Sequence, residues 1–226
     1  MNQQKNYVAR VQASVDLHVA QVRDLLMQTF VLGAPNQKGM LQSLAMMTKD
    51  REAAIRDIAS GAFSDYVCPI ASGPESGDHL LDFHQTFVRR ASSILSLIQA
   101  QAIGTGLKVR LAESLAKAGS STYLRARSVN VISSFSPKVR DNAGRVWSPG
   151  RLVALELRHA VVLARVECKL IEISLQELRD VATVTHPENY DLDGLTFSIT
   201  GQTPNIPTYD DIKSKVFHPN SRAGVR

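Results

Sequence analysis

Apolar residues recur along much of the chain with the spacing of amphipathic helices. Over 7–32, 40–60 and 79–101, apolar positions return about every third or fourth residue rather than every second. This period places them on one face of a helix. Gly33, closely followed by Pro35, predicts where the first of these helices ends. We therefore expect the N-terminal half to consist mainly of helices.

Interruptions of this pattern predict the connecting segments. Proline and glycine are frequent in 61–78, which predicts a loop. Gly104 and Gly106 predict a break or kink, after which helical residues resume over 107–117. The segment 123–135 contains several β-branched residues and ends in Ser-Ser-Phe-Ser-Pro. We expect this segment to be a strand or a loop.

A long helix is expected over 149–178, because Ser148 suits the N-cap position and a proline follows it at the first helical position. Short strands forming a hairpin are predicted at 181–185 and 195–200. The tail over 201–226 contains three prolines, so it is expected to be extended and docked by side chains rather than by strand pairing. The fold class that follows is mainly α with a small β element (α+β).

The composition is that of an ordinary globular protein. An apolar fraction of 44% and a charged fraction of 21% argue against wholesale disorder. No run of about 18 apolar residues and no signal peptide is visible, so no membrane segment is expected. Cys68 and Cys168 are far apart in the sequence and are typical of a reduced intracellular protein.

Positive charge is concentrated in the middle of the chain. The net charge is +5, and the segment 103–151 is much richer in Lys and Arg than in Asp and Glu. Such a surplus favours a polyanion or an acidic protein surface as neighbour, although a solvated basic face with no dedicated partner is an equal alternative. The candidate contact residues are Lys108, Arg110, Lys117, Arg125, Arg127, Lys138 and Arg140.

Motifs of common enzymes are absent from the sequence. It has no phosphate-binding Gly-Lys-Ser/Thr loop, no Gly-x-Ser-x-Gly elbow and no His-Glu-x-x-His. His79 and His84 lie near Asp78 and Asp82, and we interpret this cluster as a polar helix start. We therefore expect no catalytic residues and no cofactor.

A first distinctive motif precedes the long predicted helix. It reads Asp-Asn-Ala-Gly-Arg-Val-Trp over 141–147, and an arginine, Arg158, follows the tryptophan by eleven positions. Gly144 permits a tight turn, Arg145 offers a planar five-donor fork, and Trp147 is a large anchor that can hold the turn against the helix. The favoured interpretation is that these residues hold the fold together rather than form an active centre.

A second motif lies near the C-terminus. Gly194 and Gly201 bound a β-like segment that contains Phe197, and His218, Pro219, Asn220 and Arg222 follow in a His-Pro-Asn-x-Arg pattern. In their order and separation, the two motifs together resemble the tailed-phage minor head proteins, the MuF-like and phage minor capsid protein 2 group. The resemblance divides the chain into a helical region, 1–136, and a minor-head-protein-like module, 137–226.

The chain departs from this family's pattern at its cysteines. The family has a histidine, two spaced cysteines and a closing cysteine in this region. At the positions of the three cysteines stand Asn189, Leu192 and Ser221. His186 and His218 alone cannot supply the four N or S ligands of a zinc site, so no metal is expected. His218 is then expected to be a hydrogen-bonded structural residue, and Arg222 a clamp on backbone carbonyls or on a carboxylate.

The resemblance implies a minor structural protein of a tailed-phage head, present in several copies. Such a protein would be in the host cytoplasm during assembly and in the virion afterwards. It would dock on portal or capsid proteins, with the segment 103–151 facing packaged DNA or an acidic partner, and it would assist head assembly and DNA retention or delivery without catalysis. Two alternatives are an effector or toxin-like enzyme on the same module and a standalone basic nucleic-acid-binding protein.

Overall fold

The structure is a computed structural model that describes residues 2–33, 36–70, 74–115, 121–141, 143–175, 177–218 and 221–226. Long helices dominate these residues, and two small antiparallel sheets complete them. The fold class is therefore mainly α with a small β element, as the sequence predicted.

The chain forms two compact units, each built from several segments. Unit 1 comprises Met1–Val8, Asp57–Val88 and Ala154–Arg226, and unit 2 comprises Ala9–Arg56 and Arg89–Val153. Within the described ranges, no helix combines the length and the apolarity needed to cross a bilayer.

The first helix has the predicted end. Helix α1 spans Asn2–Met27 and continues into a π-helical turn, η1, at Gln28–Leu32. Gly33 then adopts a left-handed conformation with φ 78°, and its N–H donates to the carbonyl oxygen of Gln28. Glycine is favoured here because other residues rarely adopt a positive φ.

The loop predicted over 61–78 is wrong in its extent. Helix α2 spans Gln37–Tyr66 and α3 begins at Pro74, so most of that segment is helical. Pro74 stands at a first helical position, where its missing N–H costs no hydrogen bond. Gly61 serves a close contact rather than a turn, because a Cβ there would lie 2.8 Å from Cε1 of Tyr7.

Helix α3 spans Pro74–Leu115 without the break predicted at Gly104 and Gly106. A Cβ on Gly106 would lie 2.6 Å from Cζ of Phe30, so this glycine allows a ring to approach the helix closely. A glycine inside a helix costs about 1 kcal/mol relative to alanine. The hydrogen bonds and packing of a helix this long outweigh that cost.

The strand or loop predicted over 123–135 is also wrong, because helix α4 occupies Ser121–Ser133. The helical backbone places Ile132 fully inside unit 2 and Ser128 is buried with it. β-branched residues lose only a few tenths of a kcal/mol in a helix, so burial decides the conformation here.

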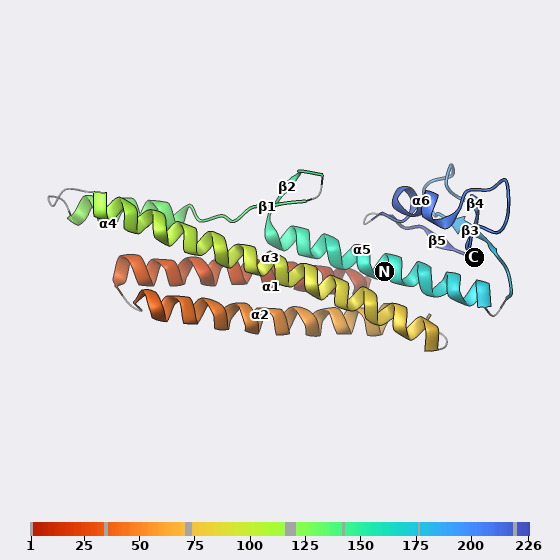
Figure 1. The fold of residues 1–226 in the computed structure, drawn as a ribbon, viewed down its shortest axis with the longest axis horizontal. Helices are drawn as coiled ribbons and strands as arrows, with labels where there is room; N and C mark the ends of the chain where they lie inside the picture. Colours follow the sequence, from red (N-terminus) through yellow and green to blue (C-terminus); the bar gives the residue numbers. More distant parts are fainter. Residues whose placement is uncertain are drawn as a thin grey trace. The chain divides into compact units, whose positions relative to one another are not determined.

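A short hairpin connects α4 to the long helix. Strands β1 (Val139–Arg140) and β2 (Val146–Trp147) are antiparallel, with Val139 opposite Trp147. Helix α5 follows at Pro149–Leu175, starting where the sequence predicted and ending three residues earlier. The Trp147 turn therefore leads directly into α5 (Figure 1).

The C-terminal part of unit 1 is a three-stranded antiparallel sheet with order β4-β3-β5. Strands β3 (Val181–Thr185) and β4 (Thr196–Ser198) are the predicted hairpin. The prediction of an extended tail without strand pairing is wrong. The tail forms helix α6 (Tyr209–Val216), and its last residues form β5 (Gly224–Val225), which pairs with β3 (Figure 1).

One buried cluster in unit 1 joins the sheet and α6 to α5. The aromatic rings of Phe197 and Phe217 are fully buried, and each lies 6.0 Å from the ring of Tyr209 between them. The hydroxyl of Tyr209 donates to Glu167 of α5 at 3.2 Å, and Lys213 forms an ion pair with the same carboxylate. The buried members from α5 are Val166, Leu170 and Ile173. The tail is thus an integral part of this unit.

Candidate functional site

Formal charge is divided very unequally between the two units. Unit 2 contains 17 Lys or Arg and 6 Asp or Glu, a formal charge of +11. Unit 1 contains 9 Lys or Arg and 15 Asp or Glu, a formal charge of −6. The modest net charge of +5 hides this contrast. A surface this basic attracts polyanions over several ångströms.

The predicted contact residues lie in unit 2. Their side chains are exposed wherever they are described: Lys108 and Arg110 on α3, Arg125 and Arg127 on α4, and Lys138 and Arg140 beside or in β1. Lys117 lies outside the described residues. Within the described part of the chain, Lys108, Arg125, Arg127 and Lys138 have no ion-pair partner, so their charge faces solvent without being neutralised.

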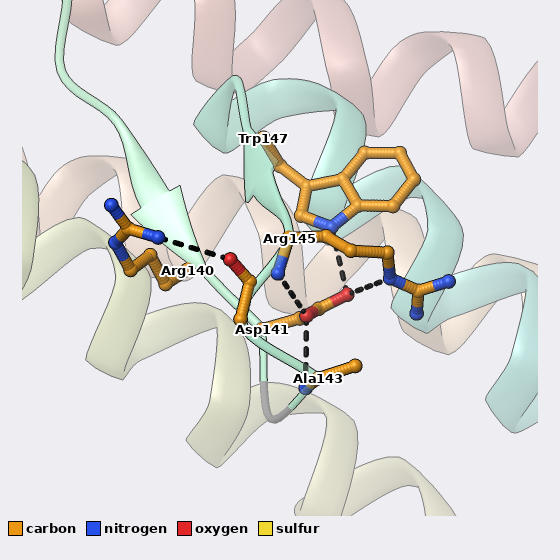
Figure 2. Close-up of polar contacts among 6 residues, drawn as sticks. Arg140, Asp141, Ala143, Arg145 and Trp147 are labelled. Atoms are coloured by element: carbon orange, nitrogen blue, oxygen red, sulfur yellow. Dashed lines mark hydrogen bonds and ion pairs between the residues drawn. The ribbon is translucent and has the colours of Figure 1, made fainter.

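The hairpin between β1 and β2 is organised by one carboxylate (Figure 2). Oδ1 of Asp141 accepts the backbone N–H groups of Ala143 and Arg145 at 3.0 and 2.9 Å. Oδ2 accepts Nε of Arg145 at 2.7 Å and the indole N–H of Trp147 at 2.9 Å. Gly144 closes the turn with φ 78°, and its carbonyl accepts a bond from the Arg140 guanidinium at 3.1 Å. The motif residues of this turn therefore form one hydrogen-bonded unit.

The same turn holds arginine side chains over an aromatic ring. The guanidinium carbons of Arg145 and Arg151 lie 5.6 and 5.3 Å from the ring centroid of Trp147, within cation–π range. The indole bond and the Arg145 bonds lower the pKa of Asp141 to about 2, although partial desolvation opposes this shift. The carboxylate thus stays ionised at neutral pH. The side chains of Arg145 and Arg151 are nevertheless exposed beside this turn.

The glycine-bounded motif near the C-terminus forms the turns at both ends of β4. Gly194 and Gly201 have positive φ angles of 84° and 82°. Asp180, just before β3, accepts hydrogen bonds from the hydroxyls of Ser198, Thr200 and Thr203 at 2.5 to 2.7 Å. These bonds lower the pKa of Asp180 well below its usual range. This arrangement has a structural role, because the carboxylate is saturated by the protein's own donors.

The closing motif is tied to the turn after β3. Arg222 forms an ion pair with the carboxylate of Glu188, which confirms the carboxylate form of the predicted clamp. Nδ1 of His186 accepts the backbone N–H groups of Glu188 and Asn189 at 3.2 and 2.9 Å, so this nitrogen organises the turn. His218 is exposed, and Pro219 and Asn220 lie outside the described residues. In the described ranges, no three His, Cys, Asp or Glu side chains gather as a metal site would require.

A large cavity in unit 1 opens beside α5 and the C-terminal strand. Its volume is about 1420 Å³, and Val225 of β5 and Val162 and Val166 of α5 contribute apolar walls. Five cationic side chains line it against two acidic ones, Glu172 and Asp193. The cationic residues are Arg158, Arg165, Lys169, Arg222 and Arg226. Arg158, identified from the motif, is thus placed on the wall of this cavity.

One Ser–His pair lies within hydrogen-bonding distance. Oγ of Ser60 on α2 lies 3.1 Å from Nε2 of His84 on α3, which is the reach between a nucleophile and its base. Ser60 is exposed, and the backbone N–H groups around it are engaged inside α2. They cannot form an oxyanion hole, the usual source of transition-state stabilisation in acyl transfer. The pair is a surface hydrogen bond between helices.

Several organising residues were missed at the level of sequence. Asp141 belongs to the first motif, but its role as acceptor for both Arg145 and Trp147 was not predicted. The Thr208–Asp211 capping box, which begins α6, is a readable signal of the form Thr-x-x-Asp. The role of Asp180 has no sequence signal, because its partners lie 18 to 23 residues away.

No family model, no curated protein and no solved structure matches this chain.

Proposed function

We propose that this chain is a non-catalytic structural protein of a tailed-phage head, which docks at the portal vertex or inner capsid and contacts packaged DNA through unit 2. The proposal combines the two sequence motifs with the distribution of charge. Its location would be the virion, after assembly in the host cytoplasm. Its partners would be portal or capsid proteins, with several copies in one assembly.

The observation that carries the DNA contact is the charge of +11 on unit 2, with its described candidate cations exposed. Lys and Arg side chains bind the phosphate backbone without reading the sequence, and each contact releases condensed counterions. A head protein that meets packaged genomes of arbitrary sequence requires this kind of contact. The hairpin supports the proposal, because Arg145 and Arg151 lie over the Trp147 ring and both side chains are exposed.

The local structure of each motif, the first in unit 2 and the second in unit 1, also supports membership of the minor-head group. The turn of the first motif continues directly into α5, and the tail that carries the second motif is tied back by β5. Residues shared by a scaffold would have these roles. A loose tail would have counted against the proposal.

The DNA contact is tested by titrating salt into a complex of the whole protein with fluorescent duplex DNA of two unrelated sequences. If the six described candidate residues each neutralise one phosphate, the logarithm of the binding constant should fall with a slope of about −5 against the logarithm of salt concentration. This corresponds to about a thousandfold loss between 50 and 200 mM salt. Binding that is insensitive to salt, or that prefers one sequence strongly, would contradict the proposal.

The charge of unit 2 equally suits a standalone nucleic-acid-binding protein, and an effector enzyme on the same module is the other alternative. Gene neighbourhood and portal binding discriminate among them. A portal gene immediately upstream supports the head protein, and an immunity gene downstream supports the effector. DNA affinity without portal or capsid binding would favour the standalone protein.

A further inference from the structure

We infer that the cavity in unit 1 binds an extended acidic segment of a partner protein, which adds to the free edge of β5. This inference goes beyond the DNA contact of unit 2. It depends on residues of unit 1 alone, so failure of DNA binding would leave it standing.

The charge of the cavity is opposite to that of the unit around it. Its lining has five Lys or Arg against two Asp or Glu. The rest of unit 1 has 4 Lys or Arg against 13 Asp or Glu. Arg165 and Arg226 are exposed at the cavity, and Lys169 is half-buried beside Glu172, with which it pairs at 2.9 Å. A concave basic surface with acidic surroundings focuses attraction on short acidic groups that can enter it.

In the described sheet, strand β5 pairs with β3 along one side only. Arg226 exchanges two hydrogen bonds of 3.0 Å with Thr183 of β3, and Gly224 lies opposite Thr185. Val225 lies between Gly224 and Arg226. In an antiparallel ladder, the N–H and C=O of a residue in this position point away from the paired strand. Those groups of Val225 therefore face away from β3, and β5 is the edge strand of the described sheet. Residues 223–226 line the cavity, so the unpaired edge borders it.

An added strand is the known way in which an extended peptide uses such an edge. The main-chain bonds would fix the peptide, and alternate side chains would point to opposite faces. Acidic side chains would meet the exposed Arg165 and Arg226, and apolar ones would meet Val162 and Val166 of α5. A volume of about 1420 Å³ exceeds that of a typical small-molecule pocket and suits a peptide segment.

A nucleic acid fits these observations less well than a peptide. Its continuous line of phosphates would extend from the cavity over a surface with a large acidic excess. It also has no use for a β-edge, whose N–H and C=O groups are spaced for another peptide backbone. An extended segment that alternates acidic and apolar residues satisfies both the charge and the edge.

The test uses the whole protein and a fluorescein-labelled ten-residue peptide of alternating Glu and Val, with alternating Lys and Val as control. Fluorescence anisotropy should show saturable binding of the acidic peptide with a Kd below about 1 mM, and no saturable binding of the basic one. Arg165→Glu should weaken binding about tenfold through charge reversal at the cavity. Arg179→Glu, an exposed position of unit 1 that does not line the cavity, should change it less than twofold.

Val225→Pro tests the strand addition. It removes an N–H that β3 does not use, so pairing with β3 should persist and circular dichroism should be unchanged. Peptide binding should weaken about fivefold, the value of one hydrogen bond. Absence of acidic-peptide binding, an unaltered Kd in Arg165→Glu, or an unaltered Kd in a folded Val225→Pro protein would overturn the inference. Displacement of the peptide by millimolar inorganic phosphate or by a ten-nucleotide single strand would also overturn it, because the cavity would then be a phosphate site.

Discussion

Neutralising three exposed cations of unit 2 should lower the salt dependence of DNA binding by a calculable amount. Arg125, Arg127 and Lys138 are suitable because their side chains are exposed and form no ion pair among the described residues. Replacing each with Gln removes charge without disturbing the Asp141 turn. The free energy of unfolding should therefore change by less than about 0.5 kcal/mol for each substitution.

The magnitude follows from counterion release. The logarithm of the binding constant falls with the logarithm of salt concentration by about 0.9 for each phosphate contact, so losing three contacts makes this slope less steep by about 2.7. Raising the salt from 50 to 200 mM weakens DNA binding of both proteins. The factor by which it weakens should be about 40 times smaller for the triple variant than for the parent protein. Fluorescence anisotropy with a duplex of fixed length measures both slopes.

The matched control is a triple variant of unit 1 in which Arg165, Arg179 and Lys215 are each replaced with Gln. These side chains are also exposed, and their loss changes the net charge by the same amount. Its slope should equal that of the parent protein. If both triple variants lower the slope equally, net charge rather than the surface of unit 2 governs binding. An unaltered slope in the unit 2 variant would likewise refute the reasoning.

Three further predictions concern stability. Phe217→Ala should lower the free energy of unfolding by about 3 to 5 kcal/mol in urea titrations, because the ring is fully buried. The control Tyr190→Ala should have little effect on this free energy, because that side chain is 89% exposed. Thr208→Ala removes the side chain that caps α6 and should lower it by about 1 kcal/mol; no change would mean that α6 is held by packing alone. His18 is fully buried, and burial, assisted by a nearby arginine, lowers its pKa to about 4 from an unfolded value near 6.5. The unfolded chain therefore binds the proton first, so stability is complete above pH 6.5 and falls by up to about 3 kcal/mol as the pH drops towards 4. His18→Leu should abolish this fall, and an identical pH profile in the variant would contradict the assignment.

Elements with local sequence signals were predicted well. The start of α5 follows from Ser148 and a proline at the first helical position, and β3 has its predicted bounds of 181–185. The helix end at Gly33 was predicted for the same reason. In each case a residue type and its position determine the backbone conformation without help from distant parts of the chain.

Elements decided by tertiary contacts were predicted poorly. The β-branched residues of α4 favour a strand when considered alone, yet burial of Ile132 stabilises a helix there. Gly106 resembles a helix breaker in the sequence, but its role is to accommodate the ring of Phe30. Strand β5 is only two residues long and depends on pairing with β3, about forty positions earlier in the chain.

The candidate sites were likewise predicted only in part from the sequence. The basic segment was identified from the sequence, and its described side chains are exposed as a contact surface requires. The full contrast between the units was not predicted, because each unit is assembled from separate segments. The cavity of unit 1 was also missed, since Arg165 of α5 and Arg226 of the tail border the same cavity only in the folded chain.

The proposed role in a phage head is tested most directly by co-purification with a candidate portal protein from the same genome, followed by imaging of the complex and of purified virions. The proposal predicts that the protein co-purifies with portal or capsid subunits and is seen in several copies at the portal vertex or inner capsid, with unit 2 towards the DNA. Failure to bind either partner, together with absence of the protein from purified virions, would contradict it.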